Sequence, residues 1–151
     1  MPLAAATVAA LLATTAPAAL AAARPARPDA EALVARAVAC IQASGPRQAY
    51  AAFTHGAAYK DGPLYVVVQD LAGRTLAHGA NARLVGQDLA ALTDLDGRPL
   101  IRQVLDLARR QGRGWSDAFS LRNAVTNGPR RHALYVQRVG DTVVSVGVPL
   151  D

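Results

Sequence analysis

Apolar residues recur every three or four positions in two parts of the chain, which is the spacing of one face of a helix. The first part, which follows Asp29, contains Leu33, Val34, Ala37, Val38, Cys40 and Ile41. The second part contains Leu100, Ile101, Val104, Leu105, Leu107 and Ala108. The pattern therefore predicts a long N-terminal helix with Asp29 as its N-cap, and a second helix that Gly112 ends.

Helix breakers and caps refine these two predictions. Residues 44–46 read Ser-Gly-Pro, which breaks or bends the first helix, and residues 48–53 continue it for a further turn or two. Residues 87–92 are expected to form a short helical piece. The segment 94–99 has two Asp residues before a Pro, so we expect an Asp to cap the second helix and Pro to occupy its first turn.

Extended segments separate and follow these helices. Residues 64–68 are an unbroken β-branched and aromatic run, typical of a strand that is covered on both faces. Gly73 supplies a turn before a second extended run at residues 74–78, so the centre of the chain is predicted to be a β-hairpin. Three further strands are expected at residues 115–119, 133–139 and 142–148, the last two joined by a two-residue turn that starts with Gly140. This order predicts an α+β domain with a five-stranded antiparallel sheet.

Six short stretches follow one another from the hairpin onward: LYVVVQDLAGRTLAHG from Leu64, NARLVGQDL from Asn81, LTDLDGRPLI from Leu92, GRGWSD from Gly112, NAVTNG from Asn123 and ALYVQRV from Ala133. In that order they resemble the type-2 form of the single Cache domain family, the extracytoplasmic small-molecule sensing modules of bacteria. The resemblance covers residues 49–148. It implies a long N-terminal helix packed along a PAS-like sheet, a small-molecule ligand, and signalling or chemotaxis through a membrane histidine kinase or chemoreceptor.

The first residues of the chain have the composition of an export signal. Residues 4–23 are almost entirely Ala, Leu, Val and Thr, and they end in small residues of the A-x-A form before Arg24 and Pro25. We therefore interpret residues 1–23 as a signal peptide and residues 24–151 as one Cache-like domain, periplasmic or secreted. No Lys or Arg precedes the apolar run, so an uncleaved membrane anchor is the alternative.

Charge and cysteine content restrict the partners. The chain has 16 Lys and Arg residues against 11 Asp and Glu residues, a net charge of +5, and one cysteine, Cys40. A single cysteine forms no intrachain disulfide, and its apolar helical setting is that of a core residue. The basic residues are scattered and are not interleaved with aromatic residues, which argues against nucleic acid as a partner. A small anion, such as a carboxylate, suits the charge. Monomer and homodimer both stay open.

Candidate ligand-binding residues follow from the resemblance and from side-chain chemistry. His78 matches the last position of the family's D-x-x-G-x-x-x-x-H pattern, which implies a structural or pocket-wall role. The family reads roughly G-W-x-D-Y and then N-P-x-T in the region of Trp115, Phe119 and Asn123, although Ala118 replaces the Tyr. We expect Trp115 and Phe119 to line a hollow together with nearby cationic groups.

An anion-binding role is expected near the start of the fourth strand. The family commonly has Lys three residues before the Tyr that Tyr135 matches, and His132 stands there in this chain. Arg122 and Arg131 stay charged and can bind a carboxylate through two hydrogen bonds. We therefore expect at least one of His132, Arg122 and Arg131 to contact the ligand.

Metal and catalytic chemistry find little support. Asp94 and Asp96 are spaced like the start of a calcium loop, but the later ligands of such a loop are missing, so no metal or cofactor is expected. The chain lacks the usual hydrolase and phosphate-loop motifs, and we expect no enzyme activity. Two alternatives remain: an accessory periplasmic protein with a vestigial pocket, since Ala118 and Pro149 stand where the family has tyrosines, and a small periplasmic hydrolase that uses His55, His78 or His132.

Overall fold

The computed structural model describes residues 25–122 and 126–150. Residues 1–23, interpreted as a signal peptide, and the candidate ligand residue Asn123 lie outside this part of the chain. Within the described ranges, no helix is long and apolar enough to cross a membrane.

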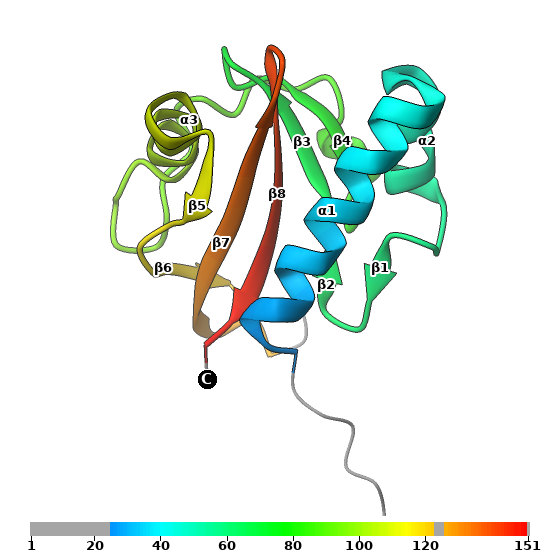
Figure 1. Cartoon of the computed structure of the whole chain (residues 1–151). Helices are drawn as coiled ribbons and strands as arrows, with labels where there is room; N and C mark the ends of the chain where they lie inside the picture. The colour runs from blue at the N-terminus through cyan, green and yellow to red at the C-terminus, as the bar shows by residue number, and fades with distance from the viewer. Residues whose placement is uncertain (1–24, 123–125, 151) are drawn as a thin grey trace, which may run out of the picture.

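The N-terminal half begins with two helices, α1 and α2, which are followed by a run of short strands (Figure 1). The elements of this half are α1 (Arg27–Ser44), α2 (Pro46–His55), β1 (Lys60–Asp61), β2 (Leu64–Tyr65), β3 (Val67–Asp70), β4 (Thr75–His78) and the 3-10 helix η1 (Ala82–Leu84). The C-terminal half contains α3 (Leu100–Gln111), β5 (Arg113–Trp115), β6 (Phe119–Arg122), β7 (Pro129–Val139) and β8 (Thr142–Pro149).

The main sheet is antiparallel at every pairing and has the strand order β4-β3-β8-β7-β5. In place of the single strand predicted at residues 115–119, the structure has β5 and β6, which both pair with the same edge of β7. The sheet thus has six strands in five positions, one more strand than predicted, and the predicted α+β class with an N-terminal helix and an antiparallel sheet is confirmed. The turn between β7 and β8 contains Gly140 with a positive φ of 58°, as expected for a Gly-first turn.

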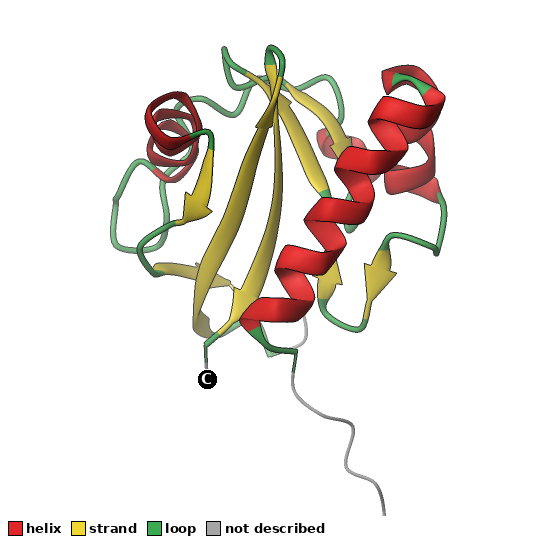
Figure 2. Cartoon of the chain, viewed as in Figure 1, coloured by secondary structure: helices red, strands yellow, loops and turns green. Residues whose placement is uncertain are grey.

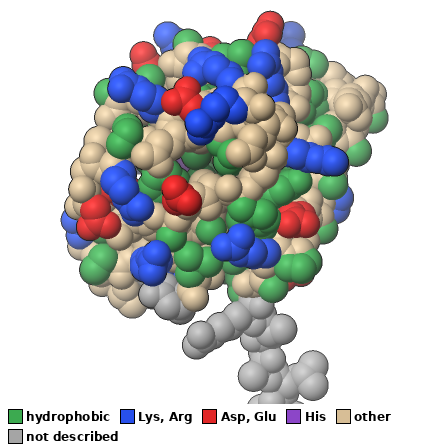
Figure 3. Space-filling model, turned by 60° about the vertical axis from the view of Figure 1, so that its left-hand side comes forward, with side chains coloured by type: hydrophobic (Ala, Val, Ile, Leu, Met, Phe, Trp, Pro, Cys, Tyr) green, Lys and Arg blue, Asp and Glu red, His purple; other side chains and the backbone are tan. Residues whose placement is uncertain are grey.

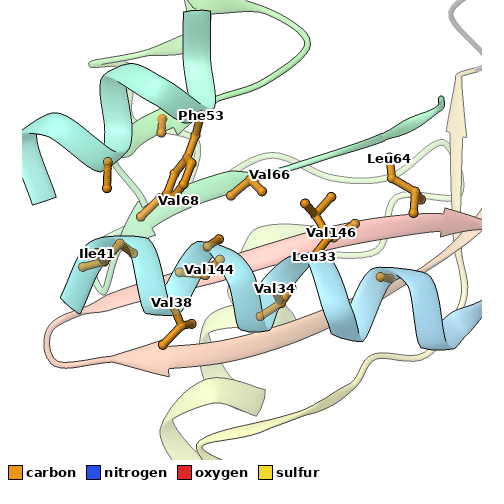
Figure 4. Close-up of a cluster of buried hydrophobic side chains, with 14 of the residues drawn as sticks. Leu33, Val34, Val38, Ile41, Phe53, Leu64, Val66, Val68, Val144 and Val146 are labelled. Carbon is orange, nitrogen blue, oxygen red and sulfur yellow. The ribbon is translucent and has the colours of Figure 1, made fainter. Parts of the chain in front are cut away.

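Helices cover the two faces of the sheet unequally (Figure 2). We call the face that packs against α1 and α2 the α1 face, and the opposite face, which packs against α3, the α3 face. Figure 4 shows how the apolar side of α1 lies along the sheet, with Phe53 of α2 beside it. The buried side chains of this core include Leu33, Val34, Val38, Phe53, Val66, Val68, Val144 and Val146.

The second core lies on the α3 face. It joins the apolar side of α3 to buried residues of three strands, and its members include Val104, Leu105, Ala108, Phe119, Val136 and Val143. Alternate residues of one strand point to opposite faces. Val143 therefore belongs to this core, while its neighbour Val144 belongs to the core under α1.

Three local expectations are wrong. Asp29 is not the N-cap of α1: that position is Ala26, whose backbone N–H donates to the Asp29 carboxylate at 2.7 Å. Residues 87–92 are not helical, and the only helical piece nearby is the three-residue η1. No Asp caps α3, whose N-cap Pro99 has no side-chain acceptor.

Candidate functional site

A β-bulge in the central hairpin decides which side chains face each core. Val68 pairs with Ala77 and Gln69 pairs with Thr75, so Leu76 is an extra residue in β4. Leu76 packs with Ala77 against the α1-face core. Thr75 shares the α3 face with its partner Gln69, which also pairs with Val143 of the α3-face core.

Five polar side chains gather on the α3 face of β2, β3, β4 and β8. We call them the polar cluster: Tyr65, Gln69, Thr75, His78 and Ser145. Val67 pairs with both His78 and Ser145, which places those two side chains in one row across the sheet. The rings of Tyr65 and His78 lie 5.3 Å apart. Gln69, Thr75 and Ser145 are 3%, 0% and 5% exposed, so these three side chains are closed to solvent, while Tyr65 and His78 are partly buried.

Two atoms of the polar cluster are buried without a hydrogen-bond partner among the described residues. They are Gln69 Nε2 and Thr75 Oγ1. Leaving a buried polar group unpaired costs about 1–3 kcal/mol, and most buried polar groups in native proteins are paired. A buried donor and a buried hydroxyl on paired residues therefore leave hydrogen-bonding capacity that the described residues do not use.

His78 is fixed by its neighbours. Its Nδ1 accepts hydrogen bonds from the backbone N–H groups of Ala80 at 3.2 Å and Asn81 at 3.0 Å, which assigns the ring proton to Nε2. Burial lowers the pKa of His78 despite an opposing backbone hydrogen bond, so the neutral ring is favoured. Burial also raises the pKa of Tyr65, which keeps its hydroxyl protonated as a donor.

The segment between β4 and α3, residues 79–99, is bound to the sheet in its middle and again towards its C-terminal end, and we call it the covering segment. In its middle, the Thr75 N–H donates to the Gln87 carbonyl at 2.9 Å, and the Leu89 N–H donates to the Gly73 carbonyl at 2.9 Å. Gly73 has a φ of 96°, and a Cβ there would lie 2.7 to 2.9 Å from three atoms of Ala90. Glycine at this position thus allows the segment to approach the hairpin closely.

Asp94 binds the C-terminal part of the covering segment to β6. Its Oδ1 accepts from the N–H groups of Asp96 at 3.0 Å and Arg98 at 2.9 Å. Its Oδ2 accepts from the Ser120 N–H at 3.1 Å and from Arg98 Nη2 at 2.7 Å. The carboxylate therefore organises this loop and attaches it to the sheet, in place of the helix-capping role expected for an Asp of this segment.

These donors make the Asp94 interaction dependent on pH. Burial acts to raise the pKa of Asp94, but the backbone N–H groups of Arg98 and Ser120, the Arg98 side chain and the Asp96 N–H outweigh it and lower the pKa to about 2. An unfolded chain binds that proton near the ordinary Asp pKa of about 3.9. The stability that Asp94 provides is thus complete above about pH 4 and is lost as the pH falls towards 2.

We expect Asp94→Asn to lower the free energy of unfolding at pH 5 and to remove much of the additional loss between pH 5 and pH 2.5. Urea unfolding at the two pH values measures both effects. Asp106→Asn is the matched control, because Asp106 is half exposed and pairs only with Arg109, at 3.3 Å. If Asp94→Asn lost as much stability between pH 5 and pH 2.5 as the wild-type protein, Asp94 would not be the group responsible for the acid sensitivity.

The sheet separates the aromatic residues predicted to line one hollow. Phe119 pairs with His132, and both lie on the α3 face, where Phe119 is fully buried in the core. Trp115 pairs with Tyr135 on the α1 face, where their rings lie 5.3 Å apart and Trp115 Nε1 donates to Glu31 of α1 at 2.7 Å. Trp115 and Phe119 therefore pack in different cores, and their role in ligand binding stays a prediction.

The cationic candidates are divided in the same way. His132 lies on the α3 face of β7, four residues before Val136 in the strand. Its Nδ1 lies 3.2 Å from the Arg130 carbonyl oxygen. Arg122 and Arg131 are exposed on the opposite face, and Arg122 donates to the Asn127 carbonyl at 3.0 Å. Seen from the side of α3, basic side chains lie among acidic and apolar ones (Figure 3). Of the candidates within the described residues, His78, His132 and Phe119 thus share the face of the polar cluster.

Four members of the polar cluster were not predicted as site residues. Gln69 and Ser145 are polar positions within otherwise apolar runs, VVVQD and VVSVGV. A polar residue in a strand that is covered on both faces needs a hydrogen-bond partner, and this signal would have identified them. Tyr65 and Thr75 carry no comparable signal, and the orientation of Thr75 depends on the bulge at Leu76.

A comparison with protein families decides the identity of the chain. The model described as Single Cache domain 2 matches residues 46–148. The chain belongs to this family. Cache domains of this kind are extracytoplasmic ligand-binding modules rather than enzymes, and the resemblance inferred from the sequence motifs is confirmed.

Solved structures similar to this Cache domain are sensor domains. A periplasmic sensor domain of a chemotaxis protein is 26% identical with a TM-score of 0.65, over 80% of this chain and 88% of the other. A methyl-accepting chemotaxis protein from Vibrio parahaemolyticus RIMD 2210633 is 19% identical with a TM-score of 0.69, over 82% and 88%. A Cache chemosensory domain described for carboxylic acid recognition is 19% identical with a TM-score of 0.64, over 80% and 86%. No curated protein matches the chain.

Proposed function

We propose that this Cache domain binds a small polar metabolite at the polar cluster, beneath the covering segment, and acts through a membrane histidine kinase or chemoreceptor. The observation that carries the proposal is the pair of buried, unpartnered atoms, Gln69 Nε2 and Thr75 Oγ1. A ligand that hydrogen-bonds to both would recover the free energy that their burial costs in the unliganded protein.

The donors of the polar cluster favour a ligand rich in acceptor atoms. Gln69, Thr75, Tyr65 and Ser145 can each donate a hydrogen bond, and so can the protonated Nε2 of His78. A carboxylate accepts several such bonds at once, and neutral donors in a closed site can hold it without a cation. The similar Cache domain described for carboxylic acid recognition supports the same ligand class. The similarity to chemotaxis sensor domains supports a membrane signalling partner and a periplasmic location.

Thermal melting of the purified protein against a panel of small carboxylates, amines and sugars tests the proposal. A ligand present at about 100 times its dissociation constant adds about 2.7 kcal/mol to the free energy of unfolding, a shift in Tm of roughly 10 °C for a domain of this size. We expect the shift from a carboxylate, and we expect Gln69→Met, which removes the amide at similar volume, to abolish it.

Arg131→Ala is the matched control for this experiment. Arg131 is exposed on the opposite face of the sheet, so its removal should leave the Tm shift unchanged. A shift that survives Gln69→Met but is lost in Arg131→Ala would place the ligand on the α1 face and overturn the assignment. A protein that responds to no member of the panel would favour an accessory role with a vestigial pocket.

A further inference from the structure

A recess lies between α2, β4 and η1, and we call it the α2 recess. Its volume is about 540 Å³, which is within the range of small-molecule sites. One wall is α2, and the other is formed by Leu76, Ala82 and Val85. Leu76 is the bulge residue that packs towards the α1 face, so the α2 recess is distinct from the polar cluster.

The α2 wall carries basic and polar groups at helical spacing. Arg47, Ala51 and His55 are four residues apart in turn, and Tyr50 lies between the first two. The nine residues from Arg47 to His55 span about 12 Å of helix. No Asp or Glu lines the α2 recess, and Arg47 forms no ion pair within the described residues. The electrostatics of this wall therefore favour an anion.

The opposite wall is apolar and partly exposed. Leu76, Ala82 and Val85 present only hydrocarbon to the recess, and Val85 is 40% exposed, which is unusual for a large apolar side chain of this protein. Covering this wall with an apolar group would remove hydrocarbon surface from water. Charge on one wall and hydrocarbon on the other together favour an amphipathic occupant.

Hydrogen bonds hold the walls in place. The His78 N–H donates to Thr54 Oγ1 of α2 at 3.2 Å, and His78 Nδ1 accepts from the Asn81 N–H. Asn81 Oδ1 in turn accepts from the Arg83 N–H at 3.1 Å, which caps η1. A single residue of β4 thus fixes α2 on one side and η1 on the other, so the recess is formed before any ligand arrives.

We propose that the α2 recess is a second ligand site, for a small amphipathic carboxylate. The carboxylate pairs with the Arg47 guanidinium through charge-assisted hydrogen bonds, and the apolar body lies across Leu76 and Val85. The site is independent of the ligand bound at the polar cluster.

Titration of the purified protein with 4-phenylbutyrate, followed by ¹H–¹⁵N NMR, tests the proposal. We expect saturable shifts at the amides of residues 47–55 and 82–85, and at least tenfold weaker binding of the neutral analogue 4-phenylbutyramide. Arg47→Gln should weaken 4-phenylbutyrate binding at least tenfold. Arg47 is exposed, so this variant should fold normally.

Two further variants separate this site from general charge effects and from the polar cluster. Arg83→Gln removes a nearby exposed cation that does not line the α2 recess, and it should change the affinity less than twofold. Gln69→Met should retain full binding of 4-phenylbutyrate. Equal affinities for acid and amide, an affinity that Arg47→Gln leaves unchanged, or shifts confined to the polar cluster would each overturn the proposal.

Discussion

Gly73→Ala will lower the free energy of unfolding by about 2–5 kcal/mol and will detach the covering segment from the hairpin. Gly73 has a φ of 96°. At such a positive φ, a residue with a Cβ lowers the free energy of unfolding by about 1–2 kcal/mol relative to glycine. The added Cβ would also lie within 3 Å of the backbone of Ala90, an overpacking that costs about 1–3 kcal/mol more. Chemical denaturation measures the total, and hydrogen exchange at Leu89 reports the lost bond to the Gly73 carbonyl.

Gly86→Ala separates the two causes. Gly86 has a φ of 87°, in the same covering segment, but a Cβ there meets no atom within 4 Å. This variant should therefore lose only the conformational part, about 1–2 kcal/mol, and should keep the Leu89 amide protected. If both variants lost the same stability, the close contact between Gly73 and Ala90 would not be what holds the covering segment to the hairpin.

Thr75→Val will raise the free energy of unfolding of the unliganded protein by about 1–3 kcal/mol, against the usual direction of core substitutions. Valine has the shape of threonine, and it removes a hydroxyl that is fully buried without a partner among the described residues. The same change should reduce or abolish the response to the ligand of the polar cluster. Urea unfolding without ligand and thermal melting with it measure the two effects.

Thr142→Val provides the comparison for that substitution. The Thr142 hydroxyl donates to the Val139 carbonyl at 2.8 Å, so replacing it should cost about 1 kcal/mol. A loss of stability in Thr75→Val similar to that in Thr142→Val would mean that Thr75 Oγ1 is paired in solution, for example by a buried water. The gain in stability expected for Thr75→Val would show that the hydroxyl is retained for binding.

The fold could be predicted from the sequence wherever local chemistry and packing agree. The apolar faces of residues 33–41 and 100–108 predicted α1 and α3, because helical spacing and core burial coincide there. The pairing of β7 with β8 followed from Gly140, whose positive φ the turn requires. The stretch 64–68 was correctly predicted as extended, although the structure divides it at Val66 into β2 and β3.

The candidate site was predicted less well. Its geometry depends on which face of the sheet each side chain points to, and on contacts between residues that are far apart in the sequence. Phe119 and Trp115 are four residues apart, a spacing that would place them on one face of an uninterrupted strand. The chain instead leaves the sheet between β5 and β6, and the two side chains point to opposite faces. Asp94 was assigned to a helix cap for a similar reason: its partner Ser120 is 26 residues away, and local sequence gives no sign of that contact.

The bulge at Leu76 has a consequence for how Cache sequences should be aligned. One residue more or fewer between Gly73 and His78 exchanges the faces to which Thr75 and its neighbours point. Where a relative differs in length here, an alignment that puts the gap after His78 would match residues of the α3 face in one protein with residues of the α1 face in the other. Comparisons of ligand specificity across the family therefore need the gap placed at Leu76 itself.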